Sequence, residues 1–355
     1  MRGKGYRYCS MTDRSQKRRR IVVTGGAGFI GSHTAVALVE AGYEPVLVDD
    51  LRNSHEEAVA GIRRIVGREI EWHCVDCGDA AAMAPVFDQP VYGAIHFAAD
   101  KAVGESVEQP EKYVDNNIGG TARLTALLRQ YGVRHLVFSS SCTVYGEAEF
   151  LPVSESAPIL PAASPYGFTK QACETLLHHA HQAADGDFGV ALLRYFNPIG
   201  AHPSAEIGEL PLGPPANLVP FLTQAVAGLR GPLTVFGNDY PTPDGTCIRD
   251  YLHVCDLAAA HVSALRWLER NEGRLETFNL GTGRGASVKE VIAAFTAATG
   301  LDVPHQMGPR RSGDVTAIYA DPTKAARELE WVTKRSLETC LEDAWRWQQR
   351  LGQKE

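Results

Sequence analysis

A glycine-spaced turn near the start of the chain constrains the fold more than any other feature of the sequence. In TGGAGFIG, Gly25, Gly28 and Gly31 follow the apolar run IVVTG and open a helical stretch over 28–41. In a dinucleotide-binding turn the first glycine permits a tight bend, the second lets the backbone approach a pyrophosphate, and the third lets helix and strand pack closely. The helix N-terminus adds unpaired N–H groups and a partial positive charge. The motif therefore predicts a βαβ unit that binds a dinucleotide.

Two acids at the end of the next strand-like run indicate which dinucleotide. Asp49 and Asp50 lie 18 and 19 residues after Gly31. An acid at this place hydrogen-bonds the adenosine ribose hydroxyls and repels a 2′-phosphate, which favours NAD over NADP. The structural alternative is an ordinary turn whose acids cap the next helix.

The rest of the first half alternates apolar runs with helical lengths. Strands are expected over 21–25, 44–50, 69–76, 93–99, 134–141 and 188–197, and helices over 28–41, 55–66, 80–87, 111–131 and 164–184. Such alternation predicts right-handed βαβ units, and near-continuous apolar strands predict a sheet covered by helices on both faces. The fold class is therefore α/β, a Rossmann-type doubly wound parallel sheet with a smaller mixed α/β domain.

The amino-acid composition changes after Asn197, where AHPSAEIGELPLGPP is rich in proline and glycine. A helix is expected over 218–228, and a strand with a glycine turn over 277–283. We therefore divide the chain into a basic, disordered extension over 1–20, an NAD-binding domain over 21–197 and a smaller mixed domain over 198–350. Part of the last, about 250–285, is expected to return to the first domain.

Charge and cysteine content exclude several function classes. The first 20 residues carry a net charge of +7, which leaves −14 on the remainder of a chain whose total is −7. An acidic body is a poor surface for nucleic acid, so any anionic ligand needs placed arginines and helix ends. No apolar run is long enough for a membrane span, and no apolar segment follows the basic start as in a secretory signal. The eight cysteines, including the lone pair Cys74 and Cys77, indicate neither a disulfide scaffold nor a metal site, and favour a cytoplasmic protein.

A candidate catalytic group follows from YGFTK. Tyr166 and Lys170 are four residues apart in an expected helix and therefore share one face. A lysine ammonium near a tyrosine hydroxyl favours the phenolate, so we expect a lowered Tyr166 pKa and a base usable near neutral pH. Ser139–Ser141 end the fifth strand, and the crevice of a doubly wound sheet lies at the carboxyl ends of its strands. Ser141 is expected to hydrogen-bond a reacting oxygen, whereas Ser139 is expected to serve the turn.

Further segments along the chain extend these motifs, namely TGGAGFIGSH, HFAADKAVGES, SSSCTVYG, SPYGFTK, LLRYFNPIGAHP, FGNDYPTPDGTCIRDYLHV and RRSGD. With them, from about Ile21 almost to the C-terminus, the chain resembles the UDP-glucose 4-epimerases, extended members of the short-chain dehydrogenase/reductase superfamily. The resemblance implies that 198–350 is a nucleotide-sugar-binding domain. TGxxGxxG and YxxxK are typical of the superfamily, whereas KAVGES, RYFNPIGAHP and DGTCIRDY are narrower. The family fold is a seven-stranded NAD domain with a smaller nucleotide-sugar domain.

The resemblance also implies two sets of binding residues. The cofactor set adds Phe29, Ile30, Asp49, Asp50, Leu51, Arg52, Asn53, Ser54, Asp76, Cys77, Phe97, Ala98, Ala99, Lys101, Asn116, Ser141, Tyr166, Lys170 and Phe196 to the three glycines. The substrate set comprises Ser141, Tyr166, Asn197, Asn217, Leu218, Thr234, Val235, Phe236, Arg249, Arg311, Asp314 and Ile318. Arg249 and Arg311 would neutralise the diphosphate, and no metal is implied.

The implied reaction is reversible C4 epimerisation of UDP-glucose and UDP-galactose, which supplies UDP-galactose in galactose metabolism. Tyr166 would remove the C4 hydroxyl proton while hydride passes to NAD, and Ser141 would hydrogen-bond the C4 oxygen. The 4-keto sugar would turn over in the site and receive the hydride on its other face. The family's usual assembly is a homodimer, in which helices around 116–128 and 164–179 form a four-helix bundle.

Three alternatives to this reading differ in chemistry. A 4,6-dehydratase needs an acid–base pair after Ser141, where this chain has Cys142 and Thr143. An NAD-binding scaffold without activity would not need Ser141, Tyr166 and Lys170. A 4-epimerase that also accepts UDP-N-acetylhexosamines depends on the residue four positions after Asp314. That residue is Ile318, and its intermediate size predicts that N-acetylated sugars react poorly. The alternative is that Ile318 is a core residue and that its neighbour Tyr319 faces the sugar instead.

Overall fold

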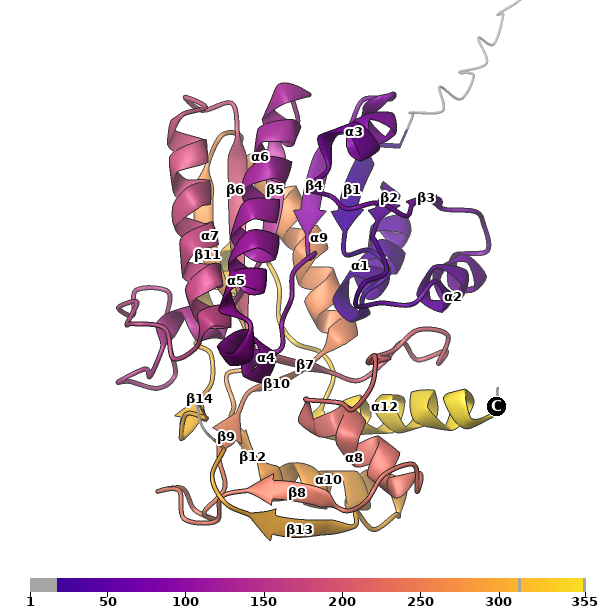
Figure 1. The fold of residues 1–355 in the computed structure, drawn as a ribbon, viewed down its shortest axis with the longest axis vertical. Helices are drawn as coiled ribbons and strands as arrows, with labels where there is room; N and C mark the ends of the chain where they lie inside the picture. Colours follow the sequence, from indigo (N-terminus) through magenta and orange to yellow (C-terminus); the bar gives the residue numbers. More distant parts are fainter. Residues whose placement is uncertain (1–17, 312–313, 354–355) are drawn as a thin grey trace, which may run out of the picture.

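The computed structural model describes residues 18–311 and 314–353, and its largest element there is a sheet of seven parallel strands (Figure 1). In spatial order the strands are β11 (Leu275–Leu280), β6 (Gly189–Tyr195), β5 (His135–Ser141), β4 (Gly93–His96), β1 (Arg20–Thr24), β2 (Glu44–Val48) and β3 (Glu71–His73). Every neighbouring pair is parallel. The order runs outward from β1 and β4 in both directions, which confirms the doubly wound fold.

Helices cover both faces of this sheet. On one face lie α1 (Phe29–Glu40), α2 (Glu57–Val66) and α9 (Val254–Arg270), and on the other lie α6 (Gly120–Gln130) and α7 (Pro165–Gln182). Figure 1 shows α6 and α7 in front of the sheet and α9 behind it. Successive residues of β1 serve the two layers, because Ile21 and Val23 pack with α1 and α9 whereas Val22 packs with α6 and α7. Two-sided burial explains the uninterrupted apolar strands.

A smaller unit lies beyond the carboxyl ends of the strands (Figure 1). It contains α8 (Leu218–Val226), α10 (Val288–Thr299), α12 (Leu337–Gly352) and the parallel pair of β8 (Leu233–Phe236) and β13 (His305–Gly308), whereas α11 (Thr323–Glu328) packs against β11 of the main sheet. Two short sheets lie between it and the main sheet, namely β7 (Asn197–Ile199) with β10 (Tyr251–His253), and β12 (Ala286–Ser287), β9 (Ile248–Arg249) and β14 (Ala317–Ile318). Leu222, Phe295 and Leu341 belong to a separate core within this unit.

The chain returns from the smaller unit to the large one between β10 and β11. Helix α9 packs against α1, and β11 pairs with β6 along its whole length, from Leu275 opposite Val190 to Leu280 opposite Tyr195. The edge of the main sheet is thus built from sequence that follows the start of the smaller unit.

Several elements differ from the sequence-based expectation. The helix expected over 111–131 consists of α5 (Pro110–Tyr113), a π-helical stretch η2 (Val114–Gly119) and α6. The short helix α4 (Val103–Glu108) precedes it where none was expected, and the expected helix over 80–87 divides into α3 (Ala80–Met83) and the 3₁₀ turn η1 (Ala84–Phe87). The strand expected over 69–76 is reduced to the three residues of β3.

The basic extension expected over 1–20 lies outside the described residues as far as residue 17. Its last residue is placed differently from the expectation, because Arg20 is the first residue of β1. The Arg20 guanidinium donates to the carbonyls of Val86 and Gln89, at 3.2 and 2.8 Å, and to the Glu71 carboxylate at 2.6 Å. These bonds hold the residue in the sheet. Among the described helices, none has the length and apolarity that a bilayer crossing requires.

Candidate active site

A cavity of about 650 Å³ lies between the carboxyl ends of the strands and the smaller unit. Within residues 18–311 and 314–353 it is lined by every residue of the expected cofactor set except Leu51 and every residue of the expected substrate set except Ile318. A cavity at the carboxyl edge of a doubly wound sheet is the usual ligand site of this fold.

The glycine turn closes one end of the cavity. Gly25 has a φ of +68°, and a Cβ atom on it would lie 2.8 Å from the backbone nitrogen of Ala98, so the turn runs directly against the end of β4. A Cβ atom on Gly31 would lie 2.1 Å from the Gly25 carbonyl oxygen. Gly28 precedes α1 and has no side chain to cap it. The first N–H groups of α1 therefore face the cavity, and they can receive a pyrophosphate.

Acidic and basic side chains surround the neighbouring part of the cavity. Asp49 accepts from the Ala27 N–H at 3.0 Å and the Ser54 hydroxyl at 2.7 Å, which orients its carboxylate at the end of β2. Arg52 contacts three separate segments, because it pairs with Asp50 and donates to Asn116 and Asp76 at 2.6 and 3.0 Å. A cradle of glycines beside a fixed acid fits the pyrophosphate and ribose of NAD.

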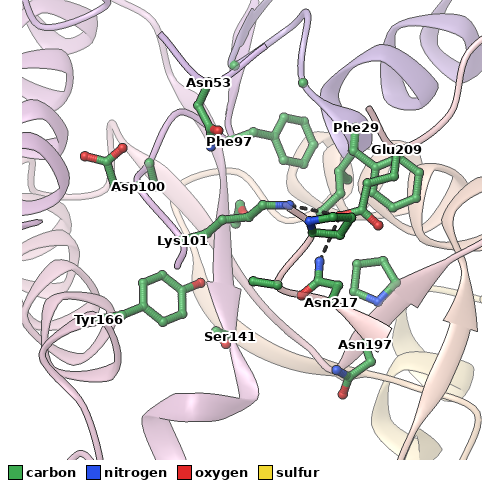
Figure 2. A pocket seen from close by; sticks show the side chains of 18 of the residues that line it. Phe29, Asn53, Phe97, Asp100, Lys101, Ser141, Tyr166, Asn197, Glu209 and Asn217 are labelled. Atoms are coloured by element: carbon green, nitrogen blue, oxygen red, sulfur yellow. Dashed lines mark hydrogen bonds and ion pairs between the residues drawn. The ribbon is translucent and has the colours of Figure 1, made fainter. Parts of the chain in front are cut away.

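The expected catalytic residues meet at the centre of the cavity. Helix α7 is capped by the Ser164 hydroxyl, which accepts from the Gly167 N–H at 3.1 Å, and has proline at its first position. Two turns of this helix carry Tyr166 and Lys170. Figure 2 shows the Tyr166 hydroxyl pointing toward the side of the cavity where Ser141 lies, at the end of β5.

Lys170 is buried and fixed. Its Nζ donates to the Ser139 carbonyl oxygen at 2.7 Å and lies 5.9 Å from the centre of the Tyr166 ring. Burial lowers the pKa of Lys170 from its ordinary 10.5 to about 8. Ser139 does not serve a turn as expected, because it lies within β5, its hydroxyl bonds to Tyr195 of β6, and it lines the cavity.

The pKa of Tyr166 departs from the expectation. Burial raises it above the ordinary 10, and a hydrogen bond with Ser141 opposes this effect without outweighing it. The predicted lowering is therefore wrong for the protein alone. The reason is that the sequence shows the neighbouring ammonium but not the depth at which the phenol is buried.

Ser141 is oriented by a residue that carries no acid–base chemistry of its own. The Ser141 oxygen accepts from the Thr143 N–H at 3.2 Å and from the Thr143 hydroxyl at 3.0 Å. Because both bonds use the serine oxygen as acceptor, its own proton is left for a further partner.

Two arginines, Arg249 and Arg311, line the end of the cavity opposite the glycine turn. Arg311 donates twice to Asp314, at 2.9 and 3.1 Å, and stacks 5.6 Å from the centre of the Phe236 ring. Arg249 lies 3.5 Å from the same carboxylate. Two guanidinium groups that share one carboxylate leave a net positive wall, which suits a diphosphate.

Two expected residues stand apart from the cavity lining that the described part of the chain forms. Leu51 has a φ of +63° and packs against the core beneath α1. Ile318 is only 5% exposed and packs with Phe196, Cys142 and Val144. It therefore lies behind Phe196, which does line the cavity.

Glu209, which the sequence did not indicate, links the loop after β4 to the start of α8 across the cavity. Its carboxylate lies 3.4 Å from the Lys101 Nζ and accepts from Asn217 at 2.8 Å, as Figure 2 shows. Asp100 was also missed, although it is buried and lines the cavity. Glu209 lies in the loop rich in proline and glycine, where no periodicity marks a site.

Comparisons with known proteins agree with this geometry. The model of the NAD dependent epimerase/dehydratase family matches residues 21–281. UDP-glucose 4-epimerase of Bacillus subtilis is 50% identical over 92% of this chain and 96% of its own length. The crystal structure of UDP-glucose-4-epimerase from Stenotrophomonas maltophila, with NAD and formylated UDP-arabinopyranose, has a TM-score of 0.92 and 45% identity over 95% of this chain and all of that one. The Bifidobacterium longum enzyme, in complex with NAD+ and UDP, has a TM-score of 0.90 and 41% identity over 93% and 98% of the two chains. The chain therefore belongs to the NAD dependent epimerase/dehydratase family.

Proposed function

We propose that the protein is a UDP-glucose 4-epimerase, which interconverts UDP-glucose and UDP-galactose with NAD as its resident cofactor. One observation carries the proposal. A single cavity holds a dinucleotide cradle at one end, a wall with two arginines at the other, and Ser141, Tyr166 and Lys170 between them. Relatives that share about half of the sequence bear this name.

The larger unit holds the cofactor. The N–H groups at the start of α1 bind the pyrophosphate, Asp49 accepts the adenosine ribose hydroxyls, and Arg52 spans the cavity over the adenosine end. NAD, when bound, supplies a nicotinamide ring that takes a hydride from C4 of the sugar and returns it. Lys170 and Tyr166 lie at the other end of this unit, near the reacting carbon.

The smaller unit holds the nucleotide sugar. Arg249 and Arg311 bind the diphosphate, Asn197, Asn217 and the strand β8 hold the rest of the UDP, and Asp314 takes the uridine ribose. Tyr166 accepts the C4 hydroxyl proton and later returns it, while Ser141 donates a hydrogen bond to the C4 oxygen. The Lys170 ammonium stabilises the tyrosinate during this transfer.

The decisive experiment incubates the purified protein with UDP-galactose and identifies the product. We expect UDP-glucose, with no loss of water from the sugar. Tyr166→Phe removes the base and keeps the ring, so turnover should fall at least about a hundredfold while the fold and bound NAD persist. Turnover within tenfold of wild type would reject Tyr166 as the base, and a dehydrated product would reject the epimerase reaction itself.

A homodimer is the assembly we propose. Val103, Val107, Val114 and Phe168 are exposed apolar side chains on α4, η2 and α7, and these elements pack against one another. Exposed apolar clusters of this kind mark association surfaces. Sedimentation at micromolar concentration tests the assembly.

We also propose a cytoplasmic location, since the seven described cysteines are free thiols, and cell fractionation tests it.

A further inference from the structure

We propose that Glu174 and Arg194 are positioning residues that fix the positions of Ser141, Tyr166 and Lys170 relative to one another. The proposal rests on the epimerase function given above. Glu174 and Arg194 are 3% and 5% exposed, and neither belongs to the cavity lining formed by the described residues. Any effect they have on the reaction must therefore pass through the residues that they contact.

The two side chains form a bidentate ion pair inside the protein. The Arg194 Nη2 lies 2.6 Å from one carboxylate oxygen of Glu174, and the Arg194 Nε lies 2.9 Å from the other. Two parallel bonds fix the relative orientation of a guanidinium and a carboxylate. Apolar residues of similar volume would often stabilise a protein as well as a buried ion pair does, so orientation is the property that this pair supplies best.

Glu174 extends the face of α7 that carries the catalytic residues. It follows Lys170 by four residues, as Lys170 follows Tyr166, so the three side chains lie on one side of the helix. The Ser140 hydroxyl donates to the Glu174 carboxylate, and the Lys170 Nζ donates to the carbonyl of Ser139. Two successive turns of α7 are thus bound to two successive residues of β5, immediately before Ser141. These bonds set both the rotation of α7 and its position along the strand.

Arg194 performs the corresponding task on the far side of Ser141. Its Nη1 donates to the Tyr145 hydroxyl at 3.0 Å, and that hydroxyl donates to Asn279 at 2.6 Å. Tyr145 ends the 3₁₀ turn η3 (Cys142–Tyr145), and Ser141 is the residue that caps this turn. The turn is therefore held at its start by Ser141 and at its end by Arg194.

The network is complete within the described residues. Ser140, Tyr145, Glu174, Arg194 and Asn279 contribute no atom to the set of buried polar side-chain atoms that lack a partner. A fully satisfied network in a low-dielectric interior is rigid, and loss of one member leaves the others unpaired. A displacement of about 1 Å among reacting groups can cost about a hundredfold in rate. We therefore expect substitutions here to change kcat rather than substrate binding.

The test compares matched substitutions in the full chain. Arg194→Met removes both bonds to Glu174, and Arg194→Lys keeps the charge but loses the two-pronged geometry. We expect kcat for UDP-galactose to fall at least tenfold in Arg194→Met and to recover in part in Arg194→Lys. The KM and the amount of NAD bound after purification should stay within threefold of wild type in both.

Milder variants keep the proposal testable if Arg194→Met does not fold. Ser140→Ala and Tyr145→Phe each delete one hydroxyl of the network, and we expect each to lower kcat at least threefold. Asp256→Asn is the control, because Asp256, at the start of α9, is equally buried and pairs with Arg335 away from the cavity. It should lower stability and leave kcat within twofold of wild type.

The outcomes separate this inference from the proposed function. If wild type converts UDP-galactose and the folded, NAD-containing variants have kcat within twofold of it, Glu174 and Arg194 are not positioning residues. An equal loss of kcat in Asp256→Asn would also overturn the inference, because general destabilisation would then explain the effect. If wild type itself does not convert UDP-galactose, the proposed function fails and this inference fails with it.

Discussion

Two ionisable residues on α7 are shifted by burial in opposite senses. The pKa of Lys170 is lowered to about 8, whereas that of Tyr166 is raised. In both cases burial disfavours the charged form, which is the form that the proposed reaction uses. The site therefore keeps a lysine that weakens the folded protein, and its removal should reveal this cost.

Lys170→Met should make the protein more stable and less active. Below pH 8 the folded wild type bears the whole cost of a buried ammonium, about 3 kcal/mol for the shift involved, less about 1 kcal/mol for the lost bond to Ser139. Between pH 8 and 10.5 the unfolded lysine binds a proton that the folded one has released, so wild-type stability rises with pH. The excess in Tm of the variant should be largest below pH 8 and smallest near pH 10.5. A lower Tm than wild type at pH 7 would contradict the buried charge.

We expect Ile318 to influence the choice of sugar from behind the cavity lining. Because it shares a buried cluster with Phe196, which lines the cavity, its bulk limits how far that ring can move away from the cavity. We expect UDP-glucose and UDP-galactose to react well and UDP-N-acetylglucosamine poorly. Ile318→Ser removes volume beside Phe196 and should raise kcat/KM for the N-acetylated pair at least about tenfold relative to the other pair, since one or two methyl groups are worth about 1–3 kcal/mol. An unchanged ratio would show that Ile318 is core alone.

At the scale of elements, the glycine turn between β1 and α1 leaves no room for a Cβ atom at position 31. An alanine at position 31 would place its Cβ atom 2.1 Å from the Gly25 carbonyl, so α1 would have to move away from the turn. We expect Gly31→Ala to cost about 1–3 kcal/mol and to empty the protein of NAD. Gly104→Ala is the matched control, because this exposed residue of α4 has no atom within 4 Å of the new Cβ. That substitution should stabilise by about 0.5–1 kcal/mol. Denaturation curves and NAD absorbance measure both effects.

The elements that the sequence predicts well are those fixed by local pattern. The main strands and helices are apolar runs and periodic stretches, and TGGAGFIG identifies its turn through residues that are close together in the chain. The π-helical η2 was not predictable, because it depends on a distant contact. The Asn117 side chain bonds both the Asp100 backbone and the Thr169 hydroxyl, at 2.8 to 3.1 Å. Such widened turns often occur at functional sites, and this one carries Asn116 at the cavity.

The same limit applies to the site as a whole. Tyr166 and Lys170 could be paired from spacing, and the resemblance supplied most of the lining. Glu209 could not be found, since its role exists only once α8 and the loop after β4 meet across the cavity. The pKa of Tyr166 and the place of Ile318 behind Phe196 depend on burial, which is a property of the complete packing rather than of any segment.

At the scale of the molecule, the proposed homodimer depends on the exposed side of α4, η2 and α7. Phe168 is 50% exposed at the start of α7, only two residues from Tyr166, so assembly and active site share one helix. A twofold axis places each substitution on both sides of an interface. Phe168→Glu would therefore bring two carboxylates into apolar surroundings, where unpaired charges are costly.

We expect Phe168→Glu to weaken self-association at least about tenfold, as sedimentation at several concentrations would measure. Leu229→Glu is the matched control, since Leu229 is 58% exposed in the smaller unit, away from these helices, and its substitution should leave association unchanged. Circular dichroism verifies that both variants are folded. If the two variants associate as wild type does, the exposed side of α7 is not the interface. If both weaken association equally, the interface involves the smaller unit as well, and the proposal that it is formed by α4, η2 and α7 is wrong.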